Sequence, residues 1–273
     1  MVRLPELIAD SRELTAQERF LHRLGAVATP FLTAAWRHLI ILNYEIEPSL
    51  LARHVPAGTE VDLWNGKAYA SVVAFLFLDA KALGSVPVPF HGEFEEINLR
   101  FYVRRRRGGE VRRGVVFVKE IVSRSLIALA ARSIYGENYV TLETGHRLRL
   151  DERGHAVEGA YWFGETGREN RIEFQTTGPF AVIQHGTREE FQIVHAWGYT
   201  RQSAHRTLEY SVAHRPWYAA PAAASLVCDV AKVYGPEFVA PLSVPAESAY
   251  VVDGSEDVAV FPGVPLEPET RSA

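Results

Sequence analysis

The sequence predicts one mainly β, barrel-like domain of the α+β class with a few helices. Beyond residue 141, segment after segment alternates apolar and polar residues, with turn sequences such as Arg153-Gly154 between them. Two further turn sequences, Asn65-Gly66 and Gly108-Gly109, are typical of hairpins. The 273 residues show no internal repeat and no clear linker, so we expect one barrel rather than two units.

The first part of the chain predicts a helix, a strand and a second short helix. Residues 1–30 form an expected helical extension, because their apolar side chains recur at helical spacing. The barrel domain is expected over 31–240 and begins with a strand at 36–46. Pro48 begins a short helix, which the Val55-Pro56 pair ends.

The middle of the chain predicts two hairpins. The first spans 62–79 around Asn65-Gly66. A Pro-rich loop at 83–90 then leads to an alternating strand at 96–103, which Gly108-Gly109 turns back into a strand at 111–122. These last two strands are therefore expected to be neighbours.

A helix is expected to begin at the N-cap Ser123 and to end at Gly136. The strands expected after it are 141–151, 156–164, 170–177, 188–200 and 205–214. Residues 241–273 form a predicted tail rich in Pro and Glu, to which 258–261 could add one strand.

Composition excludes several functional classes. The formal net charge of −4 disfavours a nucleic-acid-binding protein. A single cysteine, Cys228, excludes an intramolecular disulfide framework and a multi-cysteine zinc site. The first twenty residues contain no apolar leader, and no apolar run approaches the roughly 20 residues of a membrane span. We therefore expect a cytoplasmic protein without membrane or nucleic-acid partners, and leave a homo-oligomer open.

The strand at 96–103 carries the first candidate site. Its alternation places Glu96, Asn98, Arg100 and Tyr102 on one face, in steps of about 7 Å. If this face lines a cavity, Arg100 is suited to bind a carboxylate or phosphate through two hydrogen bonds. The alternative is a solvent-exposed polar face, with the apolar face of the same strand as the core.

Lys119 is the second candidate. Alternation places it on the face of Val115, Phe117 and Ile121, where an apolar pocket would lower the pKa of its amine and make it nucleophilic. The favoured alternative is an outward face, where its stem covers apolar surface and its amine reaches water or a carboxylate. Glu120 lies on the opposite face and competes for the interior.

Other sequence patterns give weaker evidence for a functional site. The arginines at 104–107 and 112–113 flank a hairpin tip, and a solvated tip is favoured over an anion or nucleic-acid contact. His38 and His195 lie on predicted strands and could face a cavity, but ordinary hydrogen bonding also explains buried histidines. No HExxH, GxGxxG, P-loop or GxSxG motif occurs, so no metal and no cofactor is expected.

Several segments together resemble the acetoacetate-decarboxylase-like superfamily, and in particular its uncharacterised bacterial YqjF-like branch. They are EINLRFYV, AARSIYGENYV, FQIVHAWGYT and VAHRPWYAAPA, and the resemblance covers about 32–235. It implies an antiparallel, cone-shaped closed β-barrel with a cavity inside and peripheral helices outside.

The resemblance also implies where a site would lie. True decarboxylases of this superfamily use a Schiff-base lysine and a second lysine after a turn, with a glutamate on a neighbouring strand. Here the two lysine positions fall on Tyr139 and Val140, so an imine is not expected there, whereas Glu96 matches the glutamate. Tyr135 and Tyr139 flank the turn at the expected barrel mouth, as ligand contacts or as packing residues.

These observations lead to two functional expectations. In the first, the barrel binds a small carboxylate or keto acid with Glu96 and Arg100, and Lys119 is a candidate nucleophile of a lyase- or hydrolase-like enzyme. In the second, it is a non-catalytic small-molecule binder or a structural barrel that has lost the lysine pair.

Overall fold

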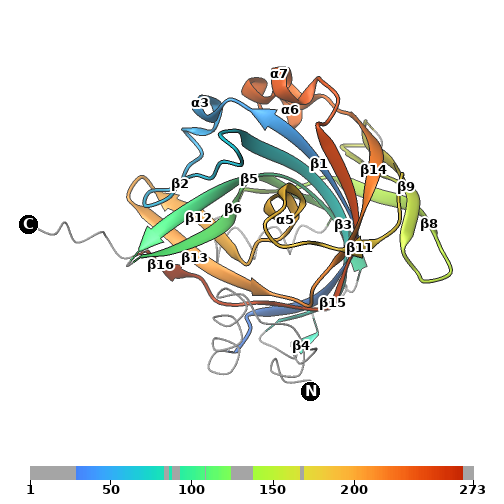
Figure 1. Ribbon diagram of the computed structural model, residues 1–273, viewed down its shortest axis with the longest axis horizontal. Coiled ribbons are helices and arrows are strands. Elements are labelled where there is room, and N and C mark those ends of the chain that lie inside the picture. Colours follow the sequence, from blue (N-terminus) through green and yellow to red (C-terminus); the bar gives the residue numbers. More distant parts are fainter. Residues whose placement is uncertain are drawn as a thin grey trace, which may run out of the picture.

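The computed structural model describes residues 29–82, 86–87, 93–107, 109–123, 138–166 and 169–266, and this part of the chain is mainly β (Figure 1). The strands are β1 (Leu32–Ile46), β2 (Glu60–Val61), β3 (Ala68–Ala82), β4 (Val86–Pro87), β5 (Glu93–Arg107), β6 (Glu110–Val122), β7 (Tyr139–Thr141), β8 (Glu143–Leu150), β9 (Ala156–Gly164), β10 (Asn170–Thr176), β11 (Ala181–Val182), β12 (Trp197–Ser203), β13 (Arg206–Ala213), β14 (Tyr218–Val227), β15 (Ser248–Val260) and β16 (Val264–Pro265). The helices are α3 (Pro48–Leu51), α5 (Arg188–Ile193), α6 (Val230–Val233), the 3-10 turn η1 (Pro236–Phe238) and α7 (Val239–Leu242).

Most strands pair antiparallel in a continuous order. Hydrogen-bonded neighbours follow the order β12-β6-β5-β3-β1-β15-β14-β10-β9-β8, and β13 pairs with both β12 and β15. The strands β1, β3, β5, β6, β12, β13 and β15 therefore form a ring of neighbours. Two joints of the ring are thin, since β6 and β12 share the single parallel pair Val115–Gly198 and β13 and β15 share two pairs.

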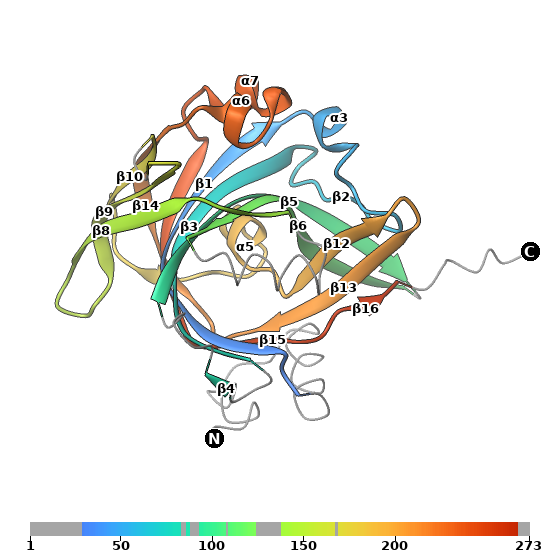
Figure 2. The ribbon, with the colours of Figure 1, turned by 180° about the vertical axis from the view of Figure 1, so that it is seen from behind.

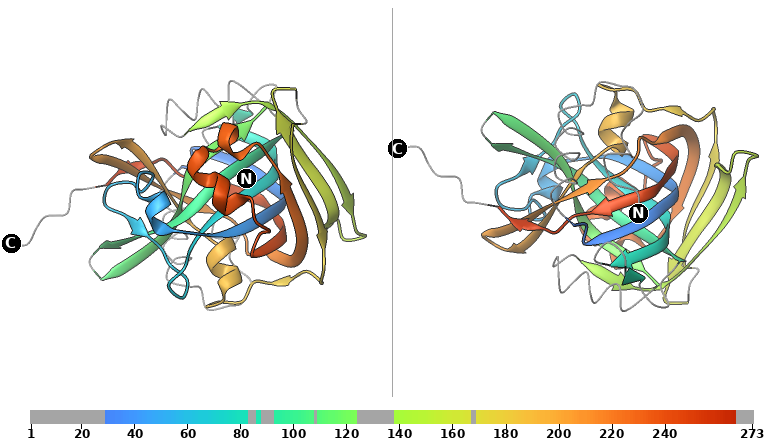
Figure 3. Two further views of the ribbon diagram at one scale, coloured as in Figure 1. Left: turned by 90° about the horizontal axis from the view of Figure 1, so that it is seen from above. Right: turned by 90° about the horizontal axis from the view of Figure 1, so that it is seen from below.

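The two faces of the curved sheet are covered by different elements. One face of β5, here called the apolar face, carries Ile97, Leu99, Phe101 and Val103. These side chains belong to the largest hydrophobic cluster, which also includes residues of β9, β10, α6 and α7. Figure 2 shows α6 and α7 over one end of the ring and β8–β10 beside it. The opposite face, here the polar face, lies toward α5, and Figure 3 shows α5 and β8 on opposite sides of the sheet.

Several predicted elements are confirmed. The strand predicted at 36–46 lies within β1, and Pro48 begins α3. Asn65 and Gly66 both have positive φ, 50° and 83°, as a tight two-residue turn requires. The hairpin around that turn is minimal, because Trp64–Lys67 is an isolated bridge and β2 pairs with β5 rather than with β3.

Other predictions need correction. The strand predicted at 188–200 is wrong in its first half, where Arg188–Ile193 forms α5. The strand predicted at 258–261 is present but begins at Ser248, and as β15 it pairs with β1 along most of its length. The helices predicted within 1–30 and between Ser123 and Gly136 lie outside the described residues.

Candidate functional site

The polar face of β5 is buried. Glu96 is 4 % exposed, Asn98 2 % and Tyr102 1 %, so the solvent-exposed alternative is wrong. The cover comes from α5, whose Gln192 carbonyl accepts hydrogen bonds from the Tyr102 hydroxyl at 2.7 Å and from an Arg100 Nη at 3.3 Å. A helix nearly a hundred residues away in sequence therefore turns this face into an interior surface.

Strand register builds a row of polar residues across four strands. Ser248 on β15 lies opposite Asn43 on β1, Asn43 opposite Ser71 on β3, and Ser71 opposite Arg100 on β5. The Ser71 hydroxyl donates to Asn43 Oδ1 at 2.6 Å, and Asn43 Nδ2 donates to the Ser248 hydroxyl at 3.2 Å. The Ser248 hydroxyl in turn donates to Gln192 Oε1 at 2.9 Å, which ties the row to α5.

No sequence-based prediction included Asn43, Ser71 or Gln192. A signal for two of them was available, since Asn43 and Ser71 are polar residues inside the apolar runs LIILNYEI and AYASVVAF. A polar residue at the centre of a buried strand needs a hydrogen-bond partner, so two such residues on neighbouring strands indicate a buried polar network.

Local sequence explains why α5 forms where it does. Thr187 is its N-cap, and the Thr187 hydroxyl accepts from the Glu190 amide at 3.2 Å. The Glu190 carboxylate accepts from the Gly186 amide at 2.7 Å. This Thr-x-x-Glu spacing is close to a capping box and could have identified the helix.

The segment around α5 also places aromatic side chains on the polar face. The Phe191 ring meets the Tyr102 ring edge-on at 5.2 Å, and the His195 ring stacks on Tyr102 at 4.6 Å with an interplanar angle of 7°. Burial, and then the positive charges of Arg100 and Arg113, hold the pKa of His195 well below its usual value. His195 is therefore neutral at pH 7. It lies between α5 and β12 rather than on a strand, so the predicted strand position is wrong, and its ring packs against Tyr102 of the polar face.

A bulge in β6 lies beside the start of β7. Leu99 pairs with Lys119 but Arg100 pairs with Phe117, so Val118 is an extra residue on β6. The Val118 carbonyl accepts from Asn138 Nδ2 at 2.9 Å, which fixes the start of β7 beside β6.

The position of β7 beside β6 brings the side chains of Glu96 and Tyr139 into contact. Tyr139 lies opposite Glu120, which lies opposite Asn98. The Tyr139 hydroxyl donates to Glu96 Oε2 at 3.5 Å, and Asn98 Nδ2 donates to Glu96 Oε1 at 3.1 Å. Three sequence-predicted residues, Glu96, Asn98 and Tyr139, are thus brought together, while Tyr135 lies outside the described residues.

Lys119 does not join this group. It lies opposite Leu99, on the apolar face of the sheet, whereas Glu120 faces the polar side. The predicted common face with Val115 and Phe117 is wrong, because the bulge at Val118 reverses the alternation between them. Burial does lower the pKa of Lys119, but on the side of the sheet away from Glu96.

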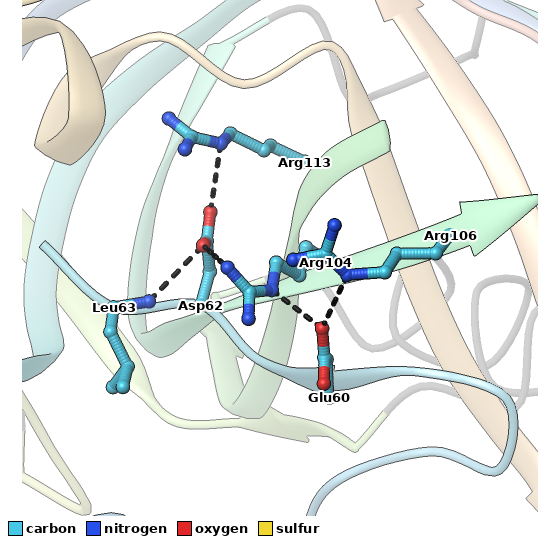
Figure 4. Close-up of polar contacts among 6 residues, drawn as sticks. All are labelled: Glu60, Asp62, Leu63, Arg104, Arg106 and Arg113. Carbon is cyan, nitrogen blue, oxygen red and sulfur yellow. Dashed lines mark hydrogen bonds and ion pairs between the residues drawn. The ribbon is translucent and has the colours of Figure 1, made fainter. Parts of the chain in front are cut away.

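The arginine cluster is held by carboxylates rather than by water alone (Figure 4). Glu60 accepts from Arg104 at 2.6 Å and from Arg106 at 3.1 Å, and Arg113 Nε lies 3.1 Å from Asp62 Oδ2. The Asp62 side chain is fully buried, and burial raises its pKa although Arg113 and Arg104 oppose the shift.

A second carboxylate binds the other half of the cluster. Glu209 on β13 accepts from Arg105 at 3.1 Å and from Arg112 at 2.5 Å. Arg105 is only 8 % exposed, so the favoured interpretation of a solvated tip is wrong for this residue. These arginines join β5 and β6 to β13, to β2 and to Asp62 directly after β2.

Two other features lie away from the polar face. His38 sits in a bulge of β1 with φ 57°, and its carbonyl accepts from the Tyr161 hydroxyl of β9 at 2.8 Å. A surface hollow of about 660 Å³ lies over β8, β9, β10 and β14, between residues such as Arg147 and Glu173, and none of the predicted site residues lines it.

Among the described residues, no set of three or more His, Cys, Asp or Glu is arranged to bind a metal ion. The described helices include none long and apolar enough to traverse a lipid bilayer.

Comparison with known proteins decides the family. The model of DUF2071, "Uncharacterized conserved protein (COG2071)", matches residues 33–258. The chain belongs to this family. The YqjF-like resemblance of the sequence is confirmed by a curated relative, "Uncharacterized protein YqjF" of Bacillus subtilis, which is 24 % identical over 123 residues. That match covers 45 % of the chain and about half, 48 %, of the relative.

Solved structures confirm the acetoacetate-decarboxylase-like fold. An acetoacetate-decarboxylase-like enzyme from Sphingomonas wittichii RW1 aligns with a TM-score of 0.59 at 12 % identity, over 86 % of this chain and 93 % of that one. The enduracididine biosynthesis enzyme MppR, complexed with pyruvate, aligns with a TM-score of 0.59 at 14 % identity, over 88 % and 92 %. Acetoacetate decarboxylase from Legionella pneumophila aligns with a TM-score of 0.57 at 11 % identity, over 88 % of each chain.

Proposed function

We propose that this DUF2071 protein binds a small carboxylate on the polar face of β5, without forming an imine. The supporting observation is a group of buried polar atoms that have no hydrogen-bond partner among the described residues. They are Asn98 Oδ1, Arg100 Nε, Gln192 Nε2 and His195 Nδ1. Buried polar atoms are nearly always satisfied, so a group of unsatisfied ones on one face favours a polar ligand.

Arg100 is the proposed carboxylate-binding residue. A guanidinium group is positively charged and presents donors in a fixed planar geometry that matches a carboxylate. It lies 5.9 Å from the Tyr102 ring centre, which holds it against the polar face. A neighbour of the same fold, MppR, was solved with pyruvate, which makes a small keto acid a reasonable first probe.

The chemistry proposed here differs from that of a Schiff-base enzyme. Tyr139 and Val140 stand where the resemblance puts the lysine pair, and Lys119 lies on the opposite face from Glu96. We propose Glu96 as the group that exchanges a proton with the ligand, because it is buried beside Tyr139 and Asn98. We also infer that the ring of strands forms the cone-shaped closed barrel that the family resemblance implies.

Isothermal titration calorimetry with acetate, pyruvate, lactate, alanine and 2-oxobutyrate tests the binding proposal. We expect at least one acid to bind the wild type and Arg100→Gln to weaken that binding by at least about 10-fold, since a charge-assisted hydrogen bond is lost. The matched control is Arg106→Gln on the same strand, whose arginine is 60 % exposed and paired with Glu60, and which should bind as the wild type does. Equal weakening by both variants, or no binding of any acid, would contradict the proposal.

Borohydride reduction in the presence of pyruvate tests the absence of an imine. We expect mass spectrometry of the digested protein to show no pyruvate adduct on any lysine, including Lys119. A stable adduct on any lysine would overturn the imine-free chemistry, and an adduct on Lys119 would restore that residue as a nucleophile.

A further inference from the structure

The orientation of the Asn98 amide is fixed by its neighbour. Its Nδ2 donates a hydrogen bond to Glu96 Oε1 at 3.1 Å. Because the nitrogen faces Glu96, the amide oxygen faces away from it. Asn98 Oδ1 is thus a buried acceptor that no described residue satisfies.

Arg100 supplies the opposite kind of group two residues further along the same face. Its Nε is a buried donor without a partner in the described part of the chain. Residues i and i+2 of a strand lie about 7 Å apart, a distance that a molecule of three or four carbon atoms can bridge between two side chains. The polar face therefore presents a donor end at Arg100 and an acceptor end at Asn98.

We infer that the ligand is a small carboxylate that also carries a hydrogen-bond donor, that is, a hydroxy acid or an amino acid rather than a keto acid. This inference rests on the proposed function. The carboxylate meets Arg100, and the hydroxyl or amine donates to Asn98 Oδ1. A keto oxygen at that point would set one acceptor against another and leave both unsatisfied.

His195 does not supply this discrimination. Its ring stacks on Tyr102, and its unsatisfied Nδ1 can act as donor or acceptor, because the neutral imidazole has two tautomers. Asn98 Oδ1 has no such freedom. The amide of Asn98 is therefore the group that distinguishes a hydroxyl from a ketone.

Matched ligand pairs test the inference by calorimetry on the full-length protein. The pairs are lactate with pyruvate and 2-hydroxybutyrate with 2-oxobutyrate, and alanine represents the amine. We expect the hydroxy acid or alanine to bind at least about 10-fold more tightly than the keto acid, the ratio that corresponds to one buried acceptor left unsatisfied.

Two variants at Asn98 separate recognition from a general defect. Asn98→Leu removes the acceptor and should bring the affinity ratio of each pair within about 2-fold, whereas Asn98→Asp keeps an acceptor and should keep the preference. The ratio is the readout, because lost folding or an added charge weakens both members of a pair alike. Retained preference in Asn98→Leu would overturn the inference.

The outcomes also separate this inference from the proposed function. Keto acids that bind as tightly as their hydroxy partners, or more tightly, would overturn the inference and leave carboxylate binding through Arg100 intact. Failure of every acid to bind would overturn both. Tighter binding of alanine than of lactate would support the inference and identify the donor as an amine.

Discussion

Glu209 holds two arginines of one hairpin, Arg105 and Arg112, in a site where its own side chain is 3 % exposed. Removing one partner of a buried ion pair leaves an uncompensated charge, which costs more than the pair itself contributes. We expect Glu209→Gln to lower the free energy of unfolding by about 3 kcal/mol. Urea titration followed by circular dichroism measures this change.

The matched control is an exposed pair between two other strands. Arg149 and Glu158 are 60 % and 51 % exposed and 2.8 Å apart. Glu158→Gln should change the free energy of unfolding by less than about 1 kcal/mol. Similar losses in both variants would show that the arginine cluster adds no more than an ordinary surface pair.

His38 links stability to pH. Burial, and then the charge of Arg37 and the nearby His146 and His155, lower its pKa from 6.5 to about 4. The unfolded chain therefore binds a proton near pH 6.5 and the folded chain only near pH 4. Its contribution to stability is complete above pH 6.5 and is lost as the pH falls toward 4.

The substitution His38→Asn tests this linkage. Asparagine tolerates the positive φ of this position and does not titrate. We expect the free energy of unfolding of the variant to depend less steeply on pH between 4 and 6.5 than that of the wild type. Identical slopes in urea titrations across this range would refute the assignment.

Single residues also show where sequence-based prediction succeeds. Alternation along 96–103 correctly grouped Glu96, Asn98 and Tyr102 on one face, because β5 is regular there. It failed for Lys119, because one extra residue, Val118, reverses the faces of β6. A bulge leaves no strong mark in the local sequence, so this error could not be avoided without strand pairing.

Gly254 shows how β15 approaches β1. Its φ is +86°, and a Cβ at this position would overlap the Trp36 carbonyl oxygen. A side chain is therefore opposed both by the backbone conformation and by the neighbouring strand. We expect Gly254→Ala to lower the free energy of unfolding by about 3 kcal/mol or more.

Gly154, in the turn between β8 and β9, separates the two effects. Its φ is +81°, but no atom lies within 4 Å of the point that a Cβ would occupy. Gly154→Ala should therefore cost only the backbone term, about 1 kcal/mol. Thermal and urea unfolding of both variants measures the difference, and equal losses would show that β1 moves away without cost.

Elements were predicted well where local signals agree with tertiary structure. The turn at Asn65-Gly66, the helix at Pro48 and the strand at 36–46 each follow from local chemistry. The segment 188–200 was mistaken for one strand because its apolar residues fit both periods, and the Thr187 cap was overlooked. Burial of the polar face depends on α5 packing over β5, which no local pattern encodes.

Neighbouring strands of the ring pair over very different lengths, and the short pairings are the places where the whole molecule can open. β1 pairs with β3 and β15 along most of its fifteen residues, whereas β12 meets β6 at one residue pair and β13 meets β15 at two. Local opening is cheapest where few hydrogen bonds and buried contacts must break together. The β12–β13 hairpin is therefore the element expected to separate first from the ring.

Hydrogen–deuterium exchange followed by mass spectrometry tests this expectation. Peptides from β12 and β13 should exchange faster than peptides from β1 and β3, although Trp197 and Tyr199 of β12 are buried. Glu209→Gln should increase that difference, because Glu209 on β13 is held by arginines of both β5 and β6. Equal protection in all four strands would mean that the thin joints open only with the whole sheet, and that side-chain packing, rather than strand pairing, keeps the ring together.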